Sequence, residues 1–282
     1  MLKRLPRFLS RYLLKKQEDS QDLHSKQSLL FHSDSVSFTE KLQYDALPRA
    51  NYAYGTYYAA LQAKALNIPK ISVIEFGVAG GSGLVELENM AFAVEKETGV
   101  IVDVYGFDTG SGMPQAKDYR DMPYVWQPGF FKMDVEALQA RLKKAQLILG
   151  DVEQTVQEFI KEKPAPIGFI SFDLDYYYST VEALKLCDQD DSFFLPRVYC
   201  YLDDIIGDDF EIHSHFTGEL LAIDEFNQRH EKRKIAKINA FRYKRMLWSP
   251  WVEQMYVFHI FDHPNYCSYV NPKHVWEAPL NN

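Results

Sequence analysis

The chain of 282 residues contains only three cysteines, Cys187, Cys200 and Cys267. They are too few and too widely spaced for a disulfide framework or a zinc site, so we expect a reduced, cytoplasmic protein. Long apolar runs are missing too. No segment approaches the roughly 20 apolar residues that span a bilayer, and the N-terminus lacks the apolar core of a secretory signal. The sequence therefore predicts neither export nor membrane spanning.

Positive charge is also scarce, because 31 Lys and Arg face 39 Asp and Glu, for a formal net charge of −8. A nucleic-acid partner is not expected, since a phosphate backbone requires a clustered basic face. Residues 1–16 are the exception, with six cations, no acid and apolar residues at helical spacing. They predict a basic amphipathic helix that lies on an anionic membrane, packs on a partner subunit in a homo-oligomer or docks on its own domain. The first alternative would make the protein peripheral to the membrane.

Residues 17–35 are polar without a sustained period and are predicted to be a linker, so that residues 1–36 form an appendage and 37–282 one domain. Hydrophobic residues make up 46% of the chain, enough for a sizeable core. From residue 71 onward, β-branched apolar runs alternate with helical patterns, which predicts an α/β fold with a mostly parallel sheet covered on both faces. The predicted strands are 71–76, 101–107, 145–149, 167–172, 197–202 and 255–261, with a weaker one at 235–241.

The helices are expected over 52–66, 84–96, 135–144, 152–161 and 219–229, with capping boxes at Ser37 to Glu40 and Ser179 to Glu182.

A glycine turn from Phe76 to Gly83 joins the predicted strand 71–76 to the predicted helix 84–96. Its glycines let the backbone approach a ligand closely, and the following helix presents unpaired N–H groups, so the turn predicts a nucleotide-like cofactor. Glu75 precedes the first glycine, where its charge would repel a pyrophosphate but suit an amino-acid moiety. This favours S-adenosylmethionine over NAD.

Acidic residues end each of the five strands between residues 71 and 202. Ligands of such sheets collect at the carboxyl ends of the strands, so we expect these acids to share one edge. Asp108 is either the ligand of the cofactor ribose or the start of a turn, and for Asp151 the role of a helix cap is favoured. Asp173, Asp203 and Asp204 are candidate Mg²⁺ ligands, because hard cations prefer carboxylate oxygens.

Taken in order, these segments resemble the macrocin O-methyltransferase family, S-adenosylmethionine-dependent enzymes of class I that methylate sugar hydroxyls on natural products. The similar segments lie within residues 50–230: Glu75 to Gly81, Asp108 to Pro114, Gly150 to Thr155, Asp173 to Thr180, and Asp203-Asp204. The resemblance implies a seven-stranded Rossmann-like sheet whose last strand runs antiparallel between its neighbours. It also implies cofactor contacts by Glu75, Gly77, Gly81, Ser82, Asp108 and, near the adenine, Asp151, with Mg²⁺ held by Asp173, Asp203 and Asp204.

The chain departs from the family at Gly110-Ser111, at Asp151 to Gln154, and at Leu174, which stands where the family has glycine. The predicted activity is Mg²⁺-assisted O-methylation of a sugar, a glycoside or another small polyhydroxyl acceptor. Asp173 or Asp175 would accept the hydroxyl proton, with His213 and His215 as further candidates. The aromatic loop 110–131 predicts a lid, although Phe130 and Phe131 are expected to pack as ordinary cover, and Trp248 and Trp251 to lie in the core.

Two alternatives stay open. An NAD-dependent oxidoreductase or epimerase would share the glycine turn, but the second half of the chain has the expected Tyr-x-x-x-Lys spacing only at Tyr269 to Lys273, beyond the last predicted strand. A non-catalytic relative could keep the fold as a binding module, since a fold does not guarantee activity.

Overall fold

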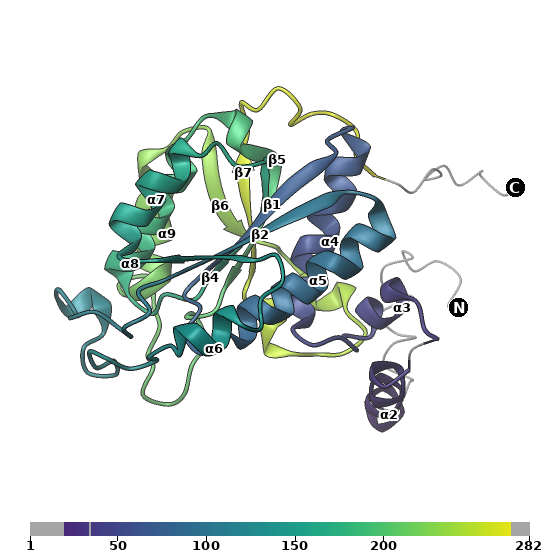
Figure 1. The fold of residues 1–282 in the computed structure, drawn as a ribbon, viewed down its shortest axis with the longest axis horizontal. Coiled ribbons are helices and arrows are strands. Elements are labelled where there is room, and N and C mark those ends of the chain that lie inside the picture. The colour runs from purple at the N-terminus through teal and green to yellow at the C-terminus, as the bar shows by residue number, and fades with distance from the viewer. Residues whose placement is uncertain (1–19, 34, 272–282) are drawn as a thin grey trace, which may run out of the picture.

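A seven-stranded sheet with helices on both faces forms the body of the molecule (Figure 1). The computed structural model describes residues 20–33 and 35–271. The strands follow the order β3-β2-β1-β4-β5-β7-β6, and β7 pairs antiparallel with both of its neighbours. This confirms the predicted α/β architecture and the antiparallel last strand. The strands are β1 (Lys70–Phe76), β2 (Ile101–Asp108), β3 (Gln146–Leu149), β4 (Ile167–Phe172), β5 (Phe194–Leu202), β6 (Arg233–Lys237) and β7 (Met255–Ile260).

Two hydrophobic cores lie on opposite faces of the sheet. On one face α4 and α5 pack over the strands, and on the other α7, α8 and α9 do so (Figure 1). Strands such as β4 are buried along their whole length, as expected for a parallel sheet covered on both sides. The helices are α2 (Ser20–Phe31), α3 (Phe38–Gln43), α4 (Ala50–Ala65), α5 (Ser82–Thr98), α6 (Val135–Gln139), α7 (Val152–Lys161), α8 (Tyr177–Leu184) and α9 (Gly218–Arg229).

The N-terminal part differs from the predicted linker. The helix α2 occupies most of it and buries Leu23 and Leu30, seven residues apart on one side, against Tyr44, Ala46 and Leu247. Two apolar residues at this spacing are enough to hold the helix in place, because they pack in a small hydrophobic core that is separate from the two cores on the sheet. The basic helix predicted for residues 1–16 lies outside the described residues.

Two local predictions were wrong. The helix α8 begins at Tyr177, before the proposed capping box, because Asp121 from a distant loop accepts the N–H of Tyr178 at 3.0 Å. Trp251 is buried as expected, but Trp248 is 67% exposed. The Ser37 cap is confirmed, since its Oγ accepts the N–H of Glu40.

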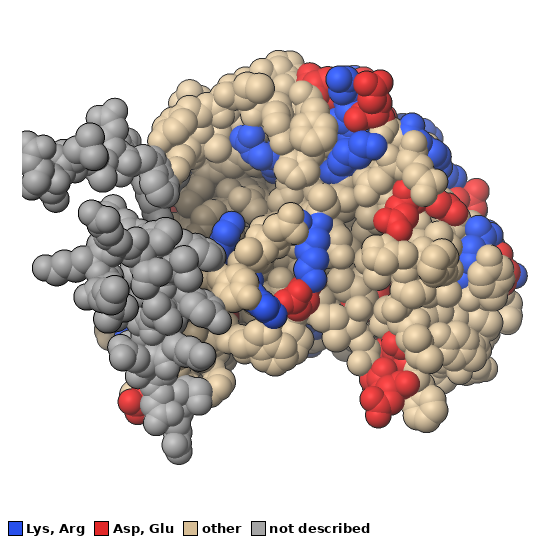
Figure 2. All heavy atoms as spheres, turned by 180° about the vertical axis from the view of Figure 1, so that it is seen from behind, with Lys and Arg blue, Asp and Glu red and all other residues tan. Residues whose placement is uncertain are grey.

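On the face turned away from the viewer in Figure 1, Lys and Arg side chains lie beside Asp and Glu in small mixed groups across a mostly uncharged surface (Figure 2). No helix among the described residues is both long enough and apolar enough to cross a membrane.

Candidate functional site

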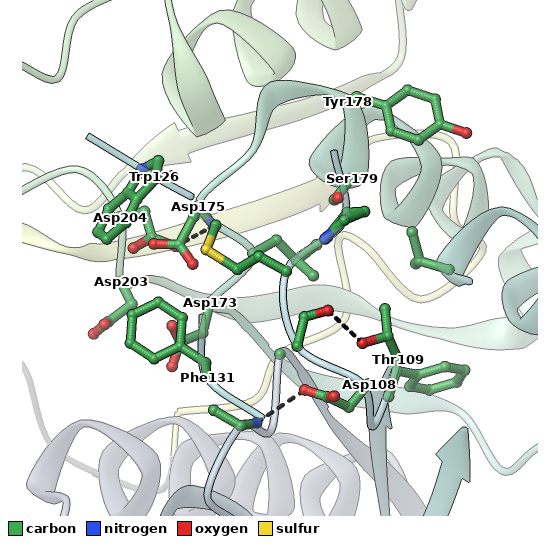
Figure 3. Close-up of a pocket in the computed structure, with 18 of the residues that line it drawn as sticks. Asp108, Thr109, Trp126, Phe131, Asp173, Asp175, Tyr178, Ser179, Asp203 and Asp204 are labelled. Atoms are coloured by element: carbon green, nitrogen blue, oxygen red, sulfur yellow. Dashed lines mark hydrogen bonds between the residues drawn. The ribbon is translucent and has the colours of Figure 1, made fainter. Parts of the chain in front are cut away.

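A pocket of about 360 Å³ lies at the carboxyl ends of the central strands (Figure 3). The glycine turn after β1 forms one wall of it. Gly77 has a φ of 83°, and a Cβ there would stand 1.6 Å from the carbonyl oxygen of Asp173. Only glycine permits this approach, which brings the ends of β1 and β4 together. Gly81 also has a φ of 83° and faces Leu138, beneath the start of α5.

Asp108 at the end of β2 ties this turn to its own strand. Its Oδ2 accepts the N–H groups of Val78 and Ala79 at 3.0 and 2.9 Å, and its Oδ1 accepts that of Gly110 at 2.6 Å. The carboxylate also lines the pocket. A carboxylate has about four lone-pair sites, of which three are taken here, so Oδ1 keeps acceptor capacity for a ribose hydroxyl.

Glu75 lies behind the turn and not in the pocket wall. Its side chain is fully buried, accepts the Tyr52 hydroxyl proton at 2.6 Å, and packs so closely under α5 that a Cβ at Gly83 would lie 1.9 Å from its Oε1. Burial raises the pKa of Glu75 to about 8. A ligand could therefore contact Glu75 directly only by reaching past the glycine turn.

Three carboxylates meet where β4 and β5 end. Asp173, Asp203 and Asp204 each place an oxygen within 4.8 Å of the others (Figure 3). Burial, followed by the charges of the neighbouring aspartates, raises the pKa of Asp173, and burial with the charge of Asp175 does the same for Asp204. Unshielded carboxylates this close repel one another, so the trio fits a hard cation that would relieve the repulsion.

Asp175 lies beside this trio. Its backbone N–H donates to Asp204 Oδ2 at 2.6 Å, and its φ of 56° turns the chain so that its side chain faces the pocket (Figure 3). Burial and the charge of Asp173 raise the pKa of Asp175 to about 7. A carboxylate with this pKa suits proton transfer near neutral pH.

Sequence reasoning missed Glu219, at the start of α9. The residue is fully buried, and neither carboxylate oxygen has a hydrogen-bond partner among the described residues. Burial, then the charge of Asp204, raises its pKa. An orphaned buried carboxylate beside three others adds to the negative potential that a cation would offset. The sequence carries no signal for it, because Glu in a first helical turn is common on exposed helices.

Tyr52, the partner of Glu75, and Arg49, whose guanidinium lies 5.2 Å from the Tyr52 ring centroid, were also missed. Both come from the start of α4, a helix that is far in sequence from every strand end except that of β1.

Of the remaining predicted site residues, one lines the pocket and the others do not. Asp151 lines the pocket and also caps α7, since its Oδ1 accepts the N–H of Glu153. Gly81 and Ser82 do not line it. His213 lies outside the pocket wall as well, with its side chain 5% exposed and its Nε2 3.7 Å from Glu211 Oε2. Burial lowers the pKa of His213. His215 is exposed and pairs with Asp224.

The aromatic loop after β2 covers the pocket in part. Met113 and the segment at Gly129 and Phe130 exchange two backbone hydrogen bonds of 2.8 Å, which close the loop on itself. Trp126 and Phe131 line the pocket (Figure 3). Phe131 is 51% exposed, so it does not serve as the ordinary cover that the sequence suggested.

Comparison with known proteins gives matches among solved structures alone, since neither a family model nor a curated protein matches this chain. The structure of the O-methyltransferase NovP matches with a TM-score of 0.50 at 13% identity, over 86% of this chain and 99% of NovP. CalS11, a calicheamicin methyltransferase, matches with a TM-score of 0.48 at 19% identity, over 85% of this chain and 91% of CalS11.

The O-methyltransferase TomG from Streptomyces achromogenes matches with a TM-score of 0.44 at 14% identity, over 86% of this chain and 96% of TomG. At such identities the likeness to NovP establishes the fold, which is that of Rossmann-like class I methyltransferases. The narrower resemblance to the macrocin family stays a prediction.

Proposed function

We propose that this protein is an S-adenosylmethionine-dependent O-methyltransferase, assisted by Mg²⁺, that acts on a hydroxyl of a sugar, a glycoside or a related small polyhydroxyl compound. The observation that carries the proposal is the meeting, in one pocket, of the glycine turn after β1 with Asp173, Asp175, Asp203 and Asp204. The first feature suits a nucleoside cofactor, and the second suits the activation of a hydroxyl.

The cofactor would bind against the ends of β1, β2 and β3. Asp108 would accept a ribose hydroxyl at Oδ1, Asp151 would lie near the adenine, and Gly77 would leave room for the sulfur end of the molecule. The amino-acid end would lie over the turn at Gly81 and Ser82, with Glu75 behind it.

The cation would be held by Asp173, Asp203 and Asp204, whose oxygens already lie together. When bound, it would acidify the acceptor hydroxyl and fix its position. Asp175 would accept the hydroxyl proton, and S-adenosylmethionine, when bound, would supply the methyl group and be left as S-adenosylhomocysteine. The transfer is an in-line displacement, so alignment by the pocket walls supplies much of the rate.

Calorimetry tests the cofactor directly. We expect S-adenosylmethionine and S-adenosylhomocysteine to bind, NADH to give no heat, and Asp108→Asn to weaken the binding by at least tenfold. Trp248→Asn, on an exposed residue away from the pocket, is the control and should leave binding unchanged. NADH binding with no response to S-adenosylmethionine would overturn the proposal in favour of an oxidoreductase.

Mass spectrometry tests the reaction. Incubation with S-adenosylmethionine, Mg²⁺ and a panel of glycosides should give a product heavier by one methyl group. Chelation, or Asp203→Asn, should stop turnover and leave cofactor binding intact. Cofactor binding without any product across the panel, with or without Mg²⁺, would indicate a binding module.

A further inference from the structure

Arg49 is a half-buried cation beside the glycine turn, and it forms no ion pair with any described residue. Among these residues its side chain donates one hydrogen bond, to Ser82 Oγ at 3.4 Å, and its guanidinium lies 5.2 Å from the ring centroid of Tyr52. A guanidinium carries five N–H donors in a planar fork that matches a carboxylate. Most of the donors of Arg49 are therefore available to a ligand.

Acidic groups act on this cation from two sides. Burial lowers the pKa of Arg49, but the acidic groups around it raise the pKa overall; they are Tyr52, Glu75, Asp173 and Asp203. Glu75 lies behind the glycine turn, whereas Asp173 and Asp203 belong to the trio that could hold a cation. The charge of Arg49 is thus felt both at the turn proposed for the amino-acid end of the cofactor and at the cation site.

The pocket wall itself offers no partner to an anionic group. Seven of its lining residues are carboxylates, and none of those in the described part of the chain is Lys, Arg or His. A carboxylate of the ligand would therefore need a cation just outside the wall. Ser82, the partner of Arg49, is the first residue of α5, so the N–H groups of the first turn of that helix add partial positive charge beside the guanidinium.

Lys117 is a second cation close to the wall. Its Nζ lies 2.8 Å from the ring centroid of Tyr178, which lines the pocket from α8 and donates its hydroxyl proton to Glu153 of α7. The helices α7 and α8 cover the face of the sheet opposite to α4 and α5 (Figure 1). Lys117 therefore belongs to the side of the pocket formed by α7 and α8, and Arg49 to the side of the glycine turn.

We infer that Arg49 binds the carboxylate at the amino-acid end of the cofactor and links this contact to the cation site. The positive charge of Arg49 opposes a divalent cation at Asp173 and Asp203, and a carboxylate on the guanidinium offsets that charge. The affinity for the cofactor should then rise when the cation is bound, and the reverse must hold to the same extent. The inference rests on the proposed function and adds the residue that joins its two ligands.

Calorimetry with two ligands tests the carboxylate contact. S-adenosylhomocysteine is compared with its decarboxylated analogue, which keeps the adenosine, the sulfur and the amine. The parent protein should prefer S-adenosylhomocysteine by about tenfold or more, as expected for hydrogen bonds between charged groups. Arg49→Met should remove most of this preference, Arg49→Lys should restore part of it, and Lys117→Met should leave it unchanged.

Binding of the decarboxylated analogue with similar affinity to all four proteins shows that the variants are folded. A preference that survives in Arg49→Met, or that is lost in Lys117→Met instead, overturns the contact.

The same titrations with and without Mg²⁺ test the link. In the parent protein Mg²⁺ should tighten the binding of S-adenosylhomocysteine by about fivefold or more, the lower end of typical couplings between sites. The effect should be absent for the decarboxylated analogue and in Arg49→Met. An equal response to Mg²⁺ in the parent and in Arg49→Met, or none in the parent, overturns the link. Failure of S-adenosylhomocysteine to bind under any condition is a separate result and would contradict the proposed function itself.

Discussion

Gly77 and Gly80 belong to one turn, but only Gly77 has no room for a side chain. A Cβ on Gly77 would stand 1.6 Å from the Asp173 carbonyl oxygen at a φ of 83°, whereas a Cβ on Gly80 would meet nothing within 4 Å. We expect Gly77→Ala to destabilise the protein by about 2 kcal/mol or more, through left-handed backbone strain and displacement of β4. It should also weaken cofactor binding. Gly80→Ala is the matched control, and equal thermal unfolding midpoints for the two variants would contradict this account.

Asp175 offers a second test at a single residue. Asn tolerates its left-handed backbone, and the N–H that Asp204 accepts belongs to the backbone, so Asp175→Asn keeps the fold. Turnover should fall by about 10²- to 10⁴-fold, the usual contribution of a general base, with cofactor affinity unchanged. Asp262→Asn, an exposed carboxylate beyond the far end of β7, is the control. Loss of cofactor binding in Asp175→Asn would indicate a structural role instead.

The pH dependence of turnover gives an independent check on the same residue. A general base acts in its deprotonated form, and the pKa of Asp175 is raised to about 7. Activity should therefore rise with pH and be lost as pH falls, with a midpoint at or below that value, because a cation held by Asp173, Asp203 and Asp204 would offset the negative charge that contributes to the shift. The residual activity of Asp175→Asn should lack this limb, and a limb that persists unchanged would assign the titration to another group.

At the scale of elements, the loop between β2 and α6 is held to α8 by Asp121. This buried side chain accepts the N–H groups of Lys117 at 2.7 Å and Tyr178 at 3.0 Å. Asp121→Ala leaves both unpaired, which should cost about 1–3 kcal/mol. We expect the KM for the acceptor to rise more than the dissociation constant of the cofactor, since Trp126 and Phe131 of this loop line the pocket in which we propose that the acceptor binds.

Asp118→Ala supplies the control for that change. Asp118 lies in the same turn, but it is more exposed and pairs with Arg120, so its loss should have little effect on stability or KM. Hydrogen exchange over residues 110–131 should accelerate in Asp121→Ala alone. Equal exchange in both variants would show that Asp121 does not anchor the loop.

The sequence predicted elements where periodicity dominates and missed contacts between distant residues. Apolar runs predicted the five strands from β1 to β5 and also β7, whereas β6, which spans Arg233–Lys237 with one buried residue, was predicted only weakly and at 235–241. Acids at strand ends pointed to the trio at Asp173, Asp203 and Asp204 because parallel strands end at one edge. The start of α8 was wrong because its capping group, Asp121, is supplied by a loop 57 residues away. Glu219 and Tyr52 were missed for the same reason, since burial and pairing arise only when α9 and α4 pack on the sheet.

At the scale of the whole molecule, the topology gathers negative charge at one edge of the sheet. The strand order places β1, β4 and β5 side by side, so Glu75, Asp173 and Asp203 end on the same side of the protein, and α9 adds Glu219 from below. The fold must therefore hold several carboxyl groups in an environment that favours their protonated forms. The free energy of unfolding should then fall as pH rises, whereas it rises with pH in proteins whose carboxylates are ion-paired.

Glu75 makes that dependence measurable. Its pKa is about 8 in the folded protein against an ordinary 4.5, so between these values the folded state holds a proton that the unfolded chain releases. Each pH unit in this window lowers the free energy of unfolding, and the loss ends as pH passes the folded pKa. Gln at position 75 keeps an acceptor for the Tyr52 hydroxyl but cannot ionise. Glu75→Gln should therefore flatten the curve and gain about 1–3 kcal/mol over the parent protein between pH 5 and pH 8, within the bound of 1.36 kcal/mol per pH unit. Urea denaturation across that range measures both slopes, and a parent protein whose stability rises with pH as steeply as that of the variant would contradict the assignment.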